Sequence, residues 1–141
     1  MNKERLKKLI YDLELTTGDL ERSLKLLKKY KEDDEFKLEF SNSLKYKYLS
    51  LFILYEDFIS MLLKEYGLYE IGISINDAII KLFNKGYLNE CESEFLNSAR
   101  IIRNKIGHRY KQPSIEAIIE FLEENNNVML ELKKLMNSYI K

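Results

Sequence analysis

One short stretch of the chain carries the residue types that phosphate-ester chemistry needs. His108 is the only histidine in 141 residues, and it lies within the densest positive charge of the sequence. The basic residues of this stretch, which contains no acid, are Arg100, Arg103, Lys105, Arg109 and Lys111. An imidazole exchanges a proton near neutral pH, and a guanidinium binds the negative oxygens of a phosphate. RNA is therefore the first substrate to consider, with His108 as general base, Arg103 on the scissile phosphate and no metal ion or cofactor.

The spacing of these two catalytic candidates poses a geometric problem. On an α-helix, at about 100° per residue, Arg103 and Tyr110 fall on nearly one stripe, whereas Arg103 and His108 diverge by roughly 140°. One regular helix cannot aim both groups at a single phosphate. Either the helix ends or unwinds near Gly107, because glycine favours helix C-termini, or a second copy of the chain in a symmetric dimer supplies the missing group.

Each of these residues also has a less specific interpretation. A histidine near a helix end often has a structural role, because a cation is favourable at a helix C-terminus. Single lysines and arginines are usually solvated charges, and Tyr110 is one of ten tyrosines that could simply pack against the last helix. If the stretch binds RNA, Asn104 orients the imidazole or a phosphate oxygen. The salt-sensitive attraction to the RNA backbone then comes from Arg100, Lys105, Arg109 and Lys111.

The pattern Arg-Asn-x3-His-x-Tyr, from Arg103 to Tyr110, resembles the signature of the HEPN superfamily. Within it the chain is similar to the HepT-like toxins, which are encoded beside a minimal nucleotidyltransferase of the MntA type. The resemblance implies a homodimeric, HEPN-like endoribonuclease in which Arg103 and His108 of both subunits line a cleft, with Asn104 beside them. It also implies that the MntA-like partner transfers AMP to Tyr110 and silences the nuclease, because added phosphates beside Arg103 would block RNA by charge and bulk.

Three functions remain open from the sequence. The leading one is a toxin ribonuclease, in which the 2′-oxygen attacks the adjacent phosphorus and leaves a cyclic phosphate, so that DNA resists cleavage. The second is a noncatalytic HEPN subunit that binds nucleotide or a nucleotidyltransferase partner. The third is a plain helical oligomerisation module without a ligand.

Composition limits the class of protein. The length suits one domain over residues 1–141, and 45% hydrophobic residues, 33% charged residues, one proline and five glycines are typical of a mostly helical globular chain. The 23 basic and 23 acidic side chains balance, so any field that attracts RNA must be local.

Cysteine use and hydropathy indicate the compartment. The single cysteine, Cys91, fits a reducing cytoplasm, and the acids Glu90, Glu92 and Glu94 around it make it a poor nucleophile. No apolar run is long enough to span a membrane, and no signal peptide is visible. We therefore expect a cytoplasmic protein with no membrane partner.

Apolar periodicity predicts an all-α, up-and-down bundle of about five helices, of which the first two are long. The first runs over residues 3–30 through a weak point at Thr17 and Gly18. The second, residues 35–65, follows an acidic cap at 31–34 and is apolar on more than one face. It packs either between helices of its own chain or partly against a second subunit.

The shorter helices carry the motif. A connector over 68–74 leads to a short helix that Ser74 and Asp77 cap and that ends at Gly86. Asn89 and Glu92 form the capping box of the motif helix, on which Arg103 borders the apolar face. Arg103 should therefore lie where a cleft or interface closes.

The last predicted helix follows the motif directly. Residues 111–114 separate it from the motif helix, because Pro113 stops one helix and Ser114 caps the next. The last helix spans residues 115–140, and its interruption at 125–127 marks either a solvated face or a kink.

Overall fold

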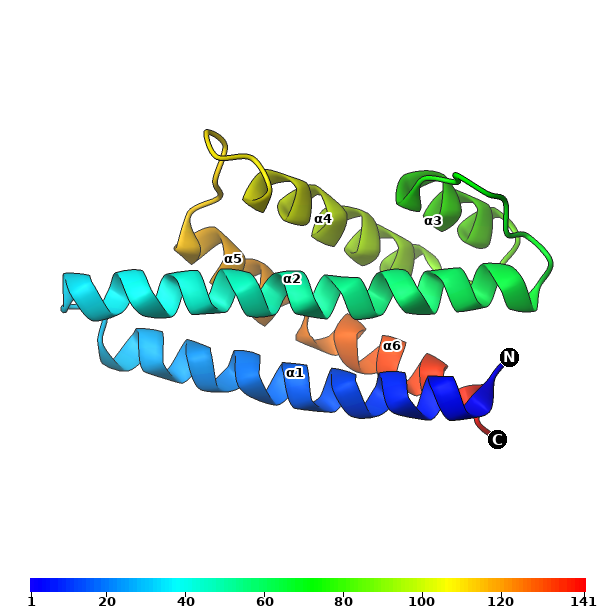
Figure 1. Ribbon diagram of the computed structural model, residues 1–141, viewed down its shortest axis with the longest axis horizontal. Coiled ribbons are helices and arrows are strands. Elements are labelled where there is room, and N and C mark those ends of the chain that lie inside the picture. The colour runs from blue at the N-terminus through cyan, green and yellow to red at the C-terminus, as the bar shows by residue number, and fades with distance from the viewer.

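In the computed structural model, which describes residues 1–141, every regular element is an α-helix (Figure 1). The six helices are α1 (Lys3–Lys29), α2 (Asp34–Glu65), α3 (Ile75–Asn84), α4 (Glu90–Ile106), α5 (Ile115–Glu124) and α6 (Asn126–Ser138). The all-α prediction is confirmed, and the first two helices are the long ones. Figure 1 shows α1 and α2 running antiparallel along the longest axis of the molecule. No helix combines the length and the apolar character that a membrane span requires.

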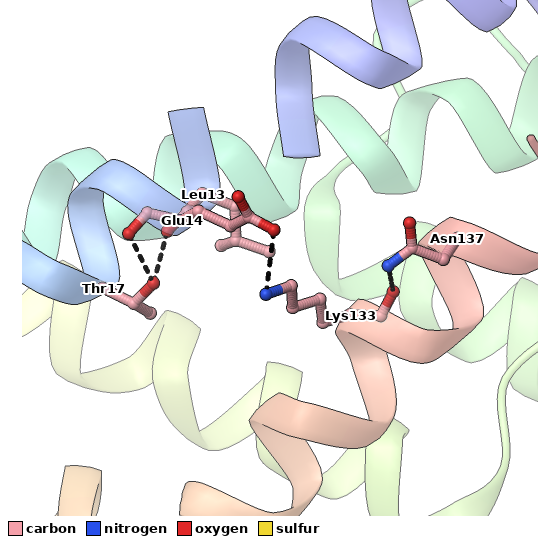
Figure 2. A network of polar contacts seen from close by, with 5 residues as sticks. All are labelled: Leu13, Glu14, Thr17, Lys133 and Asn137. Carbon is pink, nitrogen blue, oxygen red and sulfur yellow. Dashed lines mark hydrogen bonds and ion pairs between the residues drawn. The ribbon is translucent and has the colours of Figure 1, made fainter. Parts of the chain in front are cut away.

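The helix α1 stays continuous through its predicted weak point. The hydroxyl of Thr17 donates to the backbone carbonyls of Leu13 and Glu14, so the polar side chain is satisfied within the helix (Figure 2). Glu14 also forms an ion pair of 3.0 Å with Lys133 of α6, which Figure 2 shows from close by. Exposed ion pairs contribute little, so apolar packing rather than this contact holds α1 to α6.

A tight turn joins α1 to α2. The carboxylate of Asp33 accepts a hydrogen bond of 3.1 Å from the amide of Phe36, which makes Asp33 the N-cap of α2. The predicted acidic cap is therefore confirmed, and the helix begins one residue earlier than expected. Three aromatic rings close the turn, because Tyr30 lies 5.2 Å from Phe36 and 5.6 Å from Phe40 between ring centroids.

The helix α2 is the central element of the fold. It packs against α1 on one side and against α3 and α4 on the other (Figure 1). The chain's own helices thus cover most of both apolar faces, which is one of the two arrangements that the sequence allowed. Tyr46 and Ile53 nevertheless remain 72% and 51% exposed. This uncovered strip of α2 borders the site described below.

The C-terminal third of the chain differs from the prediction. The predicted helix over residues 115–140 is divided at Asn125, within the interruption that the sequence left as a solvated face or a kink, so the bundle has six helices rather than about five. The side-chain amide of Asn125 donates to the carbonyl of Phe121 at 2.8 Å and ends α5, because Asn side chains compete with the backbone for hydrogen bonds. Both helices bury apolar side chains in the one core of the molecule, α5 through Ile118 and α6 through Leu132.

Candidate functional site

The motif helix α4 is fixed at its start by the predicted capping box. The side chain of Asn89 accepts from the amide of Glu92 at 2.7 Å, and the carboxylate of Glu92 accepts from the amide of Asn89 at 2.9 Å. Ser74 accepts from the amide of Asp77 at 3.0 Å, which is the forward half of the same device at α3. Capping of this kind sets where each helix begins and therefore the register of the residues that follow.

The end of α4 resolves the geometric problem of Arg103 and His108. The helix ends at Ile106, and Gly107 is its C-cap, with its amide donating to the carbonyl of Arg103 at 3.1 Å. The prediction that Pro113 stops the motif helix is therefore wrong, because the helix ends before the proline. His108 consequently lies outside the regular helix. The φ of Gly107 is −70°, an ordinary right-handed value. A Cβ at this position would make only ordinary contacts, at 3.4 Å or more, with the carbonyls of Asn104 and Arg103, so the helix end does not require a glycine here.

Four motif residues share one open cleft with the helix α2. Arg103, Asn104, Gly107 and His108 line one wall of this cleft, whose volume is about 420 Å³. Leu49 and the exposed Ile53 of α2 line the other wall. The sequence allowed two ways to bring Arg103 and His108 together, the end of the helix near Gly107 or a second copy of the chain. Within the single chain, the end of the helix does so. The cleft brings together an imidazole, a guanidinium and an amide, the groups that proton transfer and phosphate binding need.

The other predicted RNA-binding residues do not line the cleft. Arg100 is half-buried, and its guanidinium donates to the side chain of Asn97 at 2.9 Å. Lys105, Arg109 and Lys111 are exposed to solvent. These cations surround the motif without entering the cleft, so they can act on a bound polyanion only through its flanking phosphates.

Tyr110 lies in the loop beyond α4 and is 93% exposed. It does not pack against the last helix, which was the alternative to a functional role. Because α4 ends at Ile106, Tyr110 also shares no helical stripe with Arg103. Its phenolic oxygen is open to any enzyme that approaches this loop.

Gln112 is a site residue that the sequence did not indicate. Its side-chain amide donates to the carbonyl of His108 at 3.0 Å and to the carbonyls of Ile106 and Lys105, the last two residues of α4. The terminal carbonyls of a helix have no partners within the helix, and here one side chain satisfies several of them. Gln112 therefore folds the loop back on the helix end and fixes the position of His108.

Glu56 is a second missed residue, and it changes the charge of the site. Its Oε1 lies 3.5 Å from Nη2 of Arg103, across the contact between α2 and α4. Burial raises the pKa of Glu56, the nearby guanidinium of Arg103 opposes that rise, and Asp57 adds to it. The sequence did contain an indication of this contact, because Glu56 and Asp57 are the only charged residues between Lys47 and Lys64. Adjacent acids within an apolar run need a partner on a neighbouring helix.

A second groove, between α3 and α4, is less suited to a phosphate. Its volume is about 290 Å³, and its wall contains Ile79, Ile80 and Phe83. The carboxylates of Glu90 and Glu94 also line it, with no basic side chain among the lining residues. Two carboxylates repel a phosphodiester, so the cleft at Arg103 is the better candidate.

Comparison with known proteins does not assign this chain to a family. Neither the protein-family models, nor the curated proteins, nor the solved structures give a match to this chain. No group of three or more His, Cys, Asp or Glu side chains is arranged to hold a metal ion. The function therefore has to be argued from the cleft itself.

Proposed function

We propose that this chain is an endoribonuclease of the HEPN type, similar to the HepT-like toxins, that needs no metal ion. One observation carries the proposal: the only histidine of the chain and Arg103 line the same cleft although they are five residues apart. A chance pair at that spacing on a regular helix would point in different directions.

The chemistry follows from the groups in the cleft. The imidazole of His108 takes the proton of a ribose 2′-hydroxyl, and the 2′-oxygen attacks the adjacent phosphorus. Arg103 binds the non-bridging oxygens as their charge grows, and Asn104 orients the phosphate or the imidazole. The bond to the 5′-oxygen breaks and that oxygen takes up a proton, leaving a 2′,3′-cyclic phosphate and a 5′-hydroxyl.

We expect the active form to be a homodimer in the cytoplasm. Tyr46 and Ile53 form an exposed apolar strip on α2 beside the cleft, and a second copy would cover it. In a two-fold arrangement the same patch faces itself, so two clefts would meet and the second His108 could protonate the leaving oxygen. The outer cations Arg100, Lys105, Arg109 and Lys111 would attract the RNA backbone.

The proposed control is AMP transfer to Tyr110 by an MntA-like nucleotidyltransferase. The phenolic oxygen of Tyr110 would attack the α-phosphorus of ATP, with pyrophosphate as the leaving group. Full exposure of the side chain supports this role, because the transferring enzyme must reach it. The added phosphate would place negative charge on the loop that carries His108, beside the cleft, and would compete with RNA.

A noncatalytic HEPN subunit is the alternative function. The observation that favours it is the ion pair between Glu56 and Arg103, since a carboxylate at 3.5 Å competes with any phosphate for the guanidinium. Under that alternative the chain would bind nucleotide or the nucleotidyltransferase partner and cut nothing.

Cleavage by purified protein separates the two functions. Wild type should cut single-stranded RNA in the presence of a chelator and leave DNA of the same sequence intact. His108→Ala should lose about 100-fold or more of the rate, as expected for a general base, and Arg103→Ala should lose a similar amount. Arg22→Ala, which removes an exposed arginine of α1, is the matched control and should cut normally.

Expression in cells gives the same comparison without a known target RNA. Wild type should arrest growth and His108→Ala should not. Equal toxicity of the two proteins, or no toxicity from either, would count against the nuclease and for the noncatalytic subunit.

A further inference from the structure

Glu56 holds a carboxylate oxygen that the fold leaves incompletely satisfied. Its Oε1 is fully buried and receives no hydrogen bond. The nearest cationic group, Nη2 of Arg103, lies 3.5 Å away, close enough for attraction but too far for a good hydrogen bond. A buried charged oxygen without a donor is costly, so this contact is a weakly held state rather than a tight structural pair.

The partner in this contact is the same guanidinium that faces the cleft. Arg103 is 43% exposed and lines the cleft together with Asn104 and His108, whereas Glu56 is only 25% exposed. A phosphodiester offers oxygens that match the planar fork of a guanidinium and form short, charge-assisted hydrogen bonds. Phosphate and Glu56 therefore compete for one group.

We propose that Glu56 is a positioning residue that retains Arg103 at the cleft in the free protein and yields it to the scissile phosphate, taking up a proton from solvent as it does so. The proposal rests on the proposed ribonuclease function and adds to it a means of control within the chain. In the absence of RNA, Glu56 holds the guanidinium of Arg103 beside the cleft. When Arg103 binds the phosphate instead, the carboxylate of Glu56 loses its counter-charge and takes up a proton.

The charged neighbours of Glu56 make this direction definite. In the free protein burial favours the neutral carboxyl, Arg103 favours the carboxylate, and Asp57 on the same helix opposes a second negative charge. Glu56 and Asp57 also line a second hollow with Tyr69, Ile75 and Ala78, and none of its lining residues is a cation. Of these neighbours, Arg103 alone favours the ionised form of Glu56. When Arg103 binds a phosphate instead, that effect is lost and the carboxyl of Glu56 is protonated more readily. RNA binding should therefore strengthen as pH falls.

His108 also faces the cleft, and its protonation would strengthen phosphate binding in the same direction. The test therefore uses His108→Gln as the background, which removes that second titration and prevents cleavage of the RNA. The affinity of this protein for a short single-stranded RNA is measured from pH 7.5 to pH 5 at fixed salt. We expect the dissociation constant to fall with pH, by up to about tenfold per unit where one proton is taken up.

The matched variants carry a second substitution in that background. Glu56→Gln should remove the pH dependence and bind RNA more tightly at pH 7.5, because the competing carboxylate is gone. Asp57→Asn removes a charge from the adjacent position, which forms no ion pair with Arg103, and should keep the pH dependence. Calorimetry of the His108→Gln protein in two buffers of different ionisation enthalpy counts the protons directly, so the test survives if a Glu56 variant fails to fold.

The outcomes separate the two proposals. The role of Glu56 would be overturned, and the proposed ribonuclease function left intact, by either of two results. One is RNA binding with the same pH dependence in the His108→Gln protein and in its Glu56→Gln variant, and the other is RNA binding without proton uptake. Wild-type protein that neither binds nor cuts RNA would overturn both.

Discussion

The hydroxyl of Tyr48 donates a buried hydrogen bond of 2.7 Å to the carbonyl oxygen of Ala99. This contact joins the centre of α2 to α4 one turn before Arg103, because the carbonyl of residue 99 is the one that a regular helix pairs with the amide of residue 103. Burial raises the pKa of the Tyr48 hydroxyl well above its ordinary value, so the group stays protonated and keeps donating at any pH the protein meets. The contact of Tyr48 with Ala99 thus helps to fix the position of α4 along the axis of α2.

Tyr48→Phe removes the hydroxyl and leaves the ring in place. We expect it to lower the free energy of unfolding by about 1 kcal/mol, the usual net contribution of one intramolecular hydrogen bond. Urea unfolding followed by circular dichroism measures the change. Tyr46→Phe, at an exposed position of the same helix, is the control and should change stability by less than about 0.5 kcal/mol. Equal values for the two variants would show that the contact with Ala99 contributes nothing.

Local features of the sequence predicted the parts of the site that lie close together in the chain. The capping pair Asn89 and Glu92 depends on near neighbours and is present as predicted. The helix end at Gly107 was one of two alternatives that the sequence left open, and the structure has it in place of the predicted end at Pro113. Asn125 was ambiguous for a related reason. A short polar side chain in a helix can point to solvent or bond to the preceding turn, and only the packing of α5 and α6 decides which.

Contacts between distant parts of the chain could not be predicted in the same way. Tyr48 and Ala99, like Glu56 and Arg103, meet only because α2 and α4 pack against each other. The sequence showed that Glu56 stands in an apolar run, but the periodicity of one helix does not reveal which residue faces it. Gln112 was missed because a side chain that folds back on a helix end depends on the path of the loop.

The role of Gln112 can be tested without touching the cleft. Gln112→Glu keeps the size of the side chain but removes both donors, so the carbonyls of Ile106 and His108 lose their partner. We expect faster hydrogen exchange at the amides of Gly107 and His108 and reduced RNA cleavage. Because residue 112 is exposed, the free energy of unfolding should change by less than about 1 kcal/mol.

Lys111→Ala is the matched control, since it alters the neighbouring exposed residue of the same loop. Its amide exchange should stay at the wild-type rate. A Gln112→Glu protein with wild-type exchange at Gly107 and His108 would show that the loop holds its position without this side chain.

Modification of Tyr110 is tested by coexpression with an MntA-like nucleotidyltransferase. The intact mass should rise by whole units of AMP, and the modified protein should lose its ribonuclease activity. Tyr110→Phe should abolish the increase in mass, because the acceptor oxygen is missing. Tyr11→Phe removes another exposed tyrosine, on α1 and away from the proposed dimer contact, and should be modified like wild type. A mass increase that persists in Tyr110→Phe would assign the modification to a different residue.

Replacement of Glu56 should also change how stability depends on pH. Because burial raises the pKa of Glu56 in the folded state, folding favours its protonated form. The contribution of that group to stability is therefore fully present below the ordinary glutamate range and is lost as pH rises through the raised value. Glu56→Gln, which is neutral at every pH, should melt at a higher temperature than wild type at pH 7, and the difference should shrink towards pH 4.

Glu124→Gln removes an exposed carboxylate at the end of α5 and controls for the loss of one negative charge. The substitution should change the free energy of unfolding by less than about 0.5 kcal/mol at both pH 7 and pH 4. The contrary result would be a Glu56→Gln protein that is less stable than wild type at pH 7. In that case the attraction between Glu56 and Arg103 outweighs the cost of burying the carboxylate, and the pair would be a structural ion pair rather than one that a phosphate can open.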